Sequence, residues 1–197
     1  LVEADTPPGI PLMGGLLLTS IISGRAISRS GKYRIYPIVG TLMGFIGMLL
    51  LTRITIDSPT WQLYVFTAVL GMGLGMVMQV LVLAVQNTVS ANLYGVATSG
   101  VTLFRSIGGS IGVALFGAVF TSVLQSRLTT LLPEGAGIPK GMNPVAIHQL
   151  PEAIRTDYLN AFGSAIHAAF IMAACIMVLA FVLSWLLKEA PLKTKHE

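Results

Sequence analysis

The sequence has few charged residues: Lys, Arg, Asp and Glu together make up 10% of its 197 residues. A soluble globular domain carries about 25% charged residues, so this composition excludes an ordinary water-soluble domain. Hydrophobic residues make up 54% of the chain, and the mean hydropathy is +0.80. We therefore expect an all-α integral membrane protein, because a helix satisfies its backbone hydrogen bonds internally when lipid offers no partners.

The chain also lacks the residues of common catalytic and metal sites. Its one cysteine, Cys175, excludes an intrachain disulfide. It contains no HExxH, no clustered Cys and His, no GxxxxGK[ST] and no GxSxG. The apolar stretches contain no acid that would complete a triad or bind a proton. We expect no enzyme activity, no metal and no cofactor, and the small net charge of +4 gives no reason to expect a nucleic-acid partner.

Five stretches are long and apolar enough to cross a bilayer, which takes about 20 helical residues. They cover residues 10–27, 35–52, 61–86, 95–124 and 159–187. The break between the third and fourth rests on QNTVSANLYG (86–95), whose Asn, Ser and Gly residues favour a turn. We expect one transmembrane bundle over residues 1–190, with an external loop at 125–157 and a cytoplasmic tail at 191–197. Within the loop, the Gly- and Pro-rich run 131–144 should be irregular, and Pro151 followed by Glu152 predicts the start of a helix that runs into the last stretch. Because the chain starts at Leu1 without a signal-peptide pattern, we expect part of a longer protein.

Basic residues predict the orientation. The loop after the first stretch and the segment after the last stretch are both rich in Lys and Arg. Their basic residues are Arg25, Arg29, Lys32, Arg34, Lys188, Lys193 and Lys195. Five spans place both segments on one side of the membrane, and the positive-inside rule makes that side cytoplasmic. We therefore expect a cytoplasmic C-terminus.

Glycine pairs at a four-residue spacing occur in three of the apolar stretches. They are Gly40 with Gly44, Gly71 with Gly75, and Gly108 with Gly112. Small residues at this spacing allow the backbones of membrane helices to approach closely, so we expect these three stretches to pack tightly against neighbours. The alternative is that glycine is simply frequent in membrane helices.

Arg105 is the only charged residue between Ser58 and Ser126. If its helix starts near Gly95, Arg105 lies about 15 Å into the membrane. An arginine facing lipid there costs about 2.5–3.5 kcal/mol, so we expect it to face the bundle interior or a water-filled cavity. The alternative is that the helix starts further in or tilts, and that the side chain reaches the cytoplasmic headgroups.

Met72, Met76, Gln79, Leu83 and Gln86 follow a spacing that places them on one helix face. Methionine is flexible and suits surfaces that accept varied apolar ligands. From spacing alone, ordinary packing between helices is the favoured explanation of this Met–Gln stripe. His167, in the last apolar stretch, has two interpretations as well: a hydrogen-bonded packing residue or a proton carrier.

Two runs resemble the C-terminal half of major facilitator superfamily transporters, most closely the fourteen-span drug:proton antiporters of the EmrB/QacA type. The first is SGRAISRSGKYRIYPIVG (23–40), which is similar to the cytoplasmic loop motif G-x-x-x-D-R-x-G-R. Ser28 occupies the Asp place of that motif, so a charge relay there lacks its acid. The second run is QNTVSANLYGVATSGVTLFRSIGGSIGVALFGAVF (86–120). The residues assigned to the loop motif and its surroundings are Gly24, Arg25, Arg29, Gly31, Lys32 and Arg34.

The resemblance implies the last five helices of a six-helix C-terminal bundle. Residues 61–86 would then line the substrate cavity, which makes the Met–Gln stripe a candidate substrate surface. Its candidate residues are Met72, Met76, Gln79 and Gln86. Residues 95–124 would pack between the two halves of the transporter and form a gating or bundle contact. The candidate residues there are Arg105, Gly108, Gly109 and Gly112.

The function implied is secondary active transport in a bacterial cytoplasmic membrane. Such a protein exports amphipathic, drug-like compounds in exchange for protons. Its expected partners are the lipid bilayer, a small amphipathic substrate, protons and the N-terminal half of the same transporter, where the coupling acids lie. The alternatives are a facilitator of another small solute and a non-transporting membrane scaffold.

Overall fold

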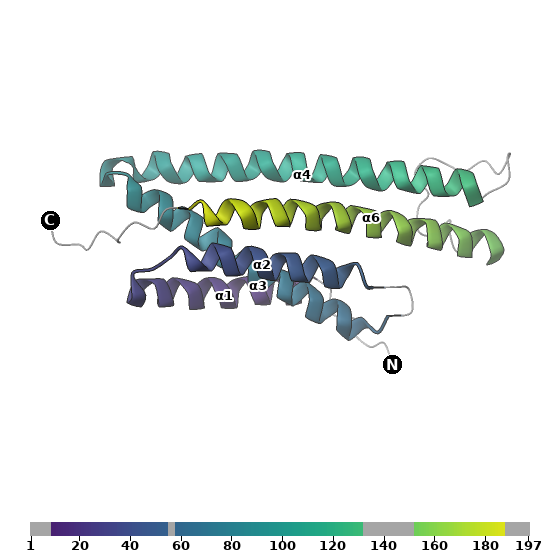
Figure 1. The fold of residues 1–197 in the computed structure, drawn as a ribbon, viewed down its shortest axis with the longest axis horizontal. Helices are drawn as coiled ribbons and strands as arrows, with labels where there is room; N and C mark the ends of the chain where they lie inside the picture. The colour runs from purple at the N-terminus through teal and green to yellow at the C-terminus, as the bar shows by residue number, and fades with distance from the viewer. Residues whose placement is uncertain (1–8, 55–57, 132–151, 188–197) are drawn as a thin grey trace.

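The computed structural model describes residues 9–54, 58–131 and 152–187, and these residues are almost entirely helical (Figure 1). The elements are α1 (Gly9–Ser30), α2 (Ile35–Leu51), α3 (Thr60–Thr88), the 3-10 turn η1 (Ala91–Leu93), α4 (Tyr94–Leu131) and α6 (Glu152–Trp185). No strand occurs in the described residues. Four helices are long and apolar enough to span a membrane, and α2 is a shorter apolar helix. The predicted all-α membrane architecture is confirmed.

The predicted turn at 86–95 is where α3 ends and α4 begins, with η1 between them. Trp61 and Trp185 lie at helix ends, as expected, in the first turn of α3 and at the last residue of α6. The helix α1 is complete despite its proline-rich start, because Pro11 falls in the first turn, where no backbone N–H is needed. The predicted cytoplasmic tail, with its lysines, lies outside the described residues.

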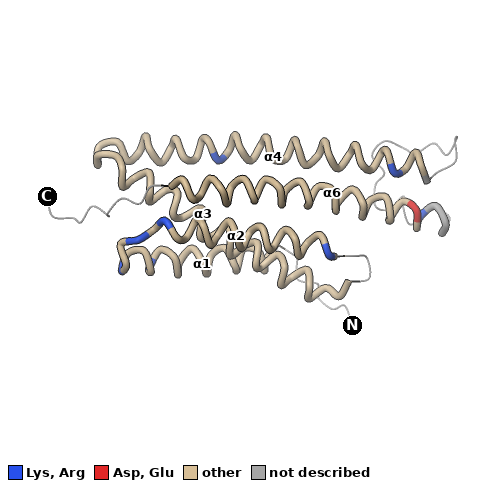
Figure 2. The backbone as a smooth tube through the Cα atoms, viewed as in Figure 1, with Lys and Arg blue, Asp and Glu red and all other residues tan. Residues whose placement is uncertain are grey.

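The helices pack in a simple order: α3 contacts α1 and α2, and α6 contacts α2 and α4. Figure 1 shows α4 and α6 side by side as the two longest helices, with α2 on the other side of α6. Basic residues gather at the α1–α2 junction, and much of the tube between the helix ends is uncharged (Figure 2).

Glycine determines how closely α1 and α3 approach. A Cβ at Gly71 would collide with the carbonyl oxygen of Leu12, and one at Gly75 with that of Leu16. Thr19 adds a hydrogen bond across this contact, because its Oγ1 donates to the carbonyl oxygen of Met72 at 2.9 Å. The predicted close packing of the Gly71–Gly75 pair is confirmed, with an interhelical hydrogen bond beside it.

A second close contact joins α2 and α3. A Cβ at Gly40 would lie 2.7 Å from the carbonyl oxygen of Gly73, and one at Gly73 would lie 2.6 Å from the amide nitrogen of Gly44. Gly44 also faces the side chain of Met177, which lies 3.3 Å from the position of a Cβ. The Gly40–Gly44 pair therefore packs as predicted. Gly73, between the two predicted glycines of α3, provides the facing surface.

Two hydrogen bonds define the relative heights of α2 and α6. Nη2 of Arg34, just before α2, donates to the carbonyl oxygen of Trp185 at 2.7 Å. Nε2 of His167 donates to the carbonyl oxygen of Ile54, just after α2, at 2.8 Å. The α6 segment between these bonds is about 27 Å long at 1.5 Å per residue, close to the thickness of a hydrocarbon core of about 30 Å. We therefore take the levels of these two bonds as the two borders of the apolar layer.

Both α4 and α6 continue beyond the second border. The part of α6 before His167 is about 20 Å long, and Figure 1 shows α4 running beside it. A separate apolar cluster holds the two extensions together through Leu124 and Leu128 of α4 and Tyr158 and Ala161 of α6. The helix start predicted at Glu152 is confirmed, because α6 begins there. Residues 125–131, expected in the external loop, instead continue α4, because Leu128 packs against α6.

Candidate functional site

The cytoplasmic loop motif coincides with the end of α1. Gly31 follows the last residue of α1 and has φ +70°, and its amide donates to the carbonyl oxygen of Ile27 at 2.8 Å. This is a left-handed helix C-cap, a conformation that glycine adopts without steric cost. Ser28, in the Asp place, donates to the carbonyl oxygen of Gly24 at 2.9 Å within its own helix. Two of the motif residues therefore shape the turn.

The basic residues of this loop fall into two groups. Arg34 is half-buried and bonds to the C-terminal end of α6, where free carbonyl groups favour a cation. Arg25, Arg29 and Lys32 are exposed. Arg34 thus joins the loop to the bundle, and the other three cations form its accessible basic surface.

The Met–Gln stripe contacts two neighbouring helices. Met72 and Met76 are half-buried, and Gln79 is exposed. Oε1 of Gln79 accepts a long hydrogen bond from Oγ of Ser20 in α1, at 3.4 Å. Nε2 of Gln86 donates to Oγ1 of Thr98 in α4, at 2.8 Å. The two glutamines thus make interhelical hydrogen bonds, and the methionines between α1 and α2 keep part of their surface accessible.

The predicted tight packing of α4 is not found within the described chain. A Cβ added at Gly108, Gly109 or Gly112 would meet no atom within 4 Å, and the most apolar window of α4 is entirely unburied. The reason is that α4 meets α6 elsewhere, through aromatic contacts such as Phe116 with Phe170. None of the described helices occupies the glycine surface of α4, so its role in close packing stays a prediction.

The structure gives a second estimate of the depth of Arg105. The ring pairs Phe116–Phe170 and Phe120–Phe162, with centroids 6.3 and 5.2 Å apart, define the antiparallel register of α4 and α6. Extending this register places Arg105 about 6–12 Å from the level of Trp185. This is less than the expected 15 Å, because the first turns of α4 extend past the level of Trp185, and the depth of Arg105 in a membrane stays a prediction.

Arg105 is exposed and forms no hydrogen bond or ion pair with any described residue. At this depth its side chain is within snorkelling distance of the nearer membrane border. The structure therefore favours the interfacial alternative over a charge at the bilayer midplane. Its exposed position beside the glycines of α4 is compatible with a contact outside the described chain.

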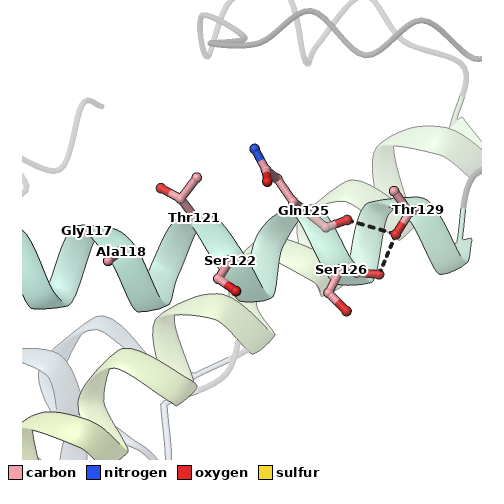
Figure 3. Close-up of a pocket in the computed structure, with 7 residues that line it drawn as sticks. All are labelled: Gly117, Ala118, Thr121, Ser122, Gln125, Ser126 and Thr129. Carbon is pink, nitrogen blue, oxygen red and sulfur yellow. Dashed lines mark hydrogen bonds between the residues drawn. The ribbon is translucent and has the colours of Figure 1, made fainter.

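A shallow hollow continues along α4 beyond these glycines. Its described lining comes from one helix only: Gly117, Ala118, Thr121, Ser122, Gln125, Ser126 and Thr129 (Figure 3). Oγ1 of Thr129 bonds to the carbonyl oxygens of Gln125 and Ser126, at 3.1 and 2.9 Å. The hydroxyl group of Thr129 therefore bonds within its own helix. The described lining is a surface of small residues on one helix, and it shows no set of groups converging on a ligand.

A larger cavity of about 760 Å³ lies between the end of α2, the start of α3 and the middle of α6. Its lining combines apolar side chains with Asn160, Ser164 and His167. Of these three polar residues, only His167 was considered from the sequence. Asn160, Ser164 and His167 repeat every three to four residues, and this spacing places three polar groups on one face of an apolar helix. That spacing is the signal by which the other two could have been found.

Comparison with known proteins identifies several proteins that are similar to this chain. No family model matches it. It is 39% identical to an uncharacterized MFS-type (major facilitator superfamily) transporter of Mycobacterium tuberculosis, over 95% of this chain and 28% of the relative. It is 30% identical to the multidrug transporter protein MdtP of Bacillus subtilis, over 94% of this chain and 39% of the relative. It is 25% identical to a tetracycline resistance determinant of Streptomyces rimosus, over all of this chain and 66% of the relative.

The chain thus spans between 28% and 66% of the length of these relatives. Two of these three relatives are named as transporters, which suggests a protein that is not an enzyme. The apolar helices of the structure are what a multi-pass membrane protein requires. Over nearly its whole length, the chain is therefore similar to membrane transporters, one of which is named as a member of the major facilitator superfamily.

Proposed function

We propose that the chain is part of a secondary active transporter that exports amphipathic compounds in exchange for protons. The observation that carries the proposal is the similarity, over nearly the whole chain, to proteins named for multidrug transport and tetracycline resistance. We further propose a place in a bacterial cytoplasmic membrane, with the basic α1–α2 loop in the cytoplasm. An N-terminal half of the same transporter would supply the proton-binding acids, since the described helices contain none within the apolar layer.

The Met–Gln stripe is the proposed substrate surface within this chain. Half-buried methionines provide an apolar surface that adapts to ligands of different shape. Gln79 provides an exposed amide one turn beyond Met76 on the same face of α3, which would orient a substrate through a hydrogen bond. This surface lies between α1 and α2, at the side of α3 that neither helix covers completely.

The exposed α4 surface around Gly108, Gly109 and Gly112 is the proposed contact with the other half of the transporter. Arg105 lies beside it near the cytoplasmic border. Rocking of one half against the other is the usual mechanism of alternating access. Small residues permit such a contact to close tightly, and an exposed cation at its edge would favour acids or carbonyl groups on the facing helix.

Ethidium transport by the full-length protein tests the proposal. In everted membrane vesicles, we expect a proton gradient to drive ethidium accumulation, and nigericin to abolish it. The double variant Met72→Ala/Met76→Ala should lower ethidium flux at least fivefold. The matched control is Met78→Ala, an exposed methionine on the same helix outside the stripe.

Flux that is independent of the gradient would contradict proton exchange. A preference for hydrophilic solutes would favour a facilitator of another class. Equal flux from the double variant and the Met78→Ala control would remove the Met–Gln stripe as the substrate surface.

A further inference from the structure

The cavity beside α6 has the polarity of a site for an amphipathic molecule. Leu51 and Phe170 line its inner part, nearer the centre of the apolar layer. Its polar groups, Asn160, Ser164 and His167, lie at the border or outside it, next to the apolar residues Leu159, Phe162 and Ile166. A ligand with its apolar part toward the membrane interior and its polar part toward the surface therefore fits this lining.

The height of the cavity agrees with this polarity. His167 bonds to Ile54 at the border of the apolar layer that lies opposite the basic α1–α2 loop. Trp61, an exposed aromatic residue of the type that settles among headgroups, lies in the α3 turn that also carries the lining residue Leu63. The cavity thus spans the boundary between acyl chains and headgroups.

The polar edge of the cavity consists of groups that accept hydrogen bonds or offer an amide. Since the carbonyl of Ile54 can only accept, Nε2 of His167 carries the hydrogen, and Nδ1 of the neutral ring is left as an acceptor. Oγ of Ser164 donates to the carbonyl oxygen of Asn160 at 2.9 Å and keeps its own lone pairs. The amide of Asn160 is exposed. Hydroxyl and ammonium groups of a lipid headgroup complement such an edge.

We propose that this cavity binds one phospholipid from the leaflet opposite the basic α1–α2 loop. An acyl chain lies against Leu51 and Phe170, and the headgroup meets the polar edge formed by Asn160, Ser164 and His167. The volume of about 760 Å³ and the apolar lining with few polar groups are typical of small-molecule sites. A bound lipid would fill the space between α2, α3 and α6. This site is separate from the proposed substrate surface and does not depend on proton exchange.

Native mass spectrometry of the full-length protein, purified in detergent with added phosphatidylethanolamine, tests this site. Gly163 lines the cavity, and a Cβ there would meet no atom within 4 Å, so Gly163→Leu fills the cavity without striking the backbone. We expect the unmodified protein to retain one phosphatidylethanolamine, and Gly163→Leu to reduce its occupancy at least tenfold. The matched control, Gly14→Leu, places the same side chain in open space on α1 and should retain the lipid.

Asn160→Leu provides a second variant that leaves the cavity volume open but removes the exposed amide. We expect it to lower lipid occupancy severalfold, with an unchanged elution volume in size-exclusion chromatography. Equal lipid retention by the unmodified protein and by both variants would overturn the proposal. Displacement of the lipid by ethidium, with ethidium flux abolished in Gly163→Leu, would assign the cavity to the transported substrate and also overturn it. If ethidium flux proves not to be driven by protons, the proposed function fails, but the lipid occupancy measured by mass spectrometry still tests this site.

Discussion

Replacing Gly15 with leucine should disrupt the packing of α1 against α3. A Cβ at Gly15 would collide with the carbonyl oxygen of Ala68 and lie 3.1 Å from the amide nitrogen of Met72. Both are backbone atoms of α3, which cannot rotate away as a side chain does. Overpacking of a well-packed interior costs about 1–3 kcal/mol, and a leucine against backbone should reach the upper end of that range. The separation of the helices would also break the hydrogen bond from Thr19 to Met72.

The neighbouring residue provides the control. Gly14 is exposed, and a Cβ there would meet no atom within 4 Å. We expect Gly14→Leu to have a melting temperature within a few degrees of the unmodified protein. Gly15→Leu should lower it by about 5 °C or more, measured by size-exclusion chromatography of heated full-length protein in detergent. Equal melting temperatures for the two variants would show that α1 and α3 do not meet through Gly15.

The double variant Gly108→Leu/Gly112→Leu should abolish transport while leaving the described bundle folded. Both positions face open space in this chain, so leucines there strike none of its described atoms. If the α4 surface meets the other half of the transporter, two leucines would hold the halves apart in the state where they close. We expect flux to fall more than tenfold, with little change in melting temperature.

Val113→Leu is the matched control for this surface. Val113 is 75% exposed and lies outside the glycine pair, so its substitution enlarges α4 without filling the close-approach surface. We expect at least half of the unmodified flux from this variant. Normal flux from the Gly108→Leu/Gly112→Leu variant would show that the surface faces lipid throughout the transport cycle.

Much of the fold could be predicted because membrane helices are local features of a sequence. Length and hydropathy located five helices, and the polar run at 86–95 located the break between α3 and α4. The spacing of Gly71 and Gly75 predicted a close contact, because the need for small residues at a helix crossing is visible in one segment alone. The sequence of one segment does not show which helix lies opposite its glycine pair.

The extension of α6 could be predicted, because Pro151 followed by Glu152 is a local signal for a helix start. The extension of α4 could not, because residues 121–131 are mixed in polarity and resemble a loop. They form a helix because Leu124 and Leu128 pair with Tyr158 and Ala161, which follow much later in the chain. The depth of Arg105 could not be estimated from α4 alone, for a related reason. It depends on the register of α4 against α6, and that register is set by aromatic contacts between the two helices.

Cysteine labelling in intact cells tests most directly whether a bilayer surrounds these helices with their ends on opposite sides. Single cysteines are introduced as Ser30→Cys, Val113→Cys and Thr129→Cys in full-length protein from which native cysteines, including Cys175, have been removed. A membrane-impermeant maleimide should react with Thr129→Cys from outside, with Ser30→Cys only after permeabilisation, and with Val113→Cys in neither case. Reaction of Ser30→Cys and Thr129→Cys from the same side, or equal reaction at all three positions, would contradict the account.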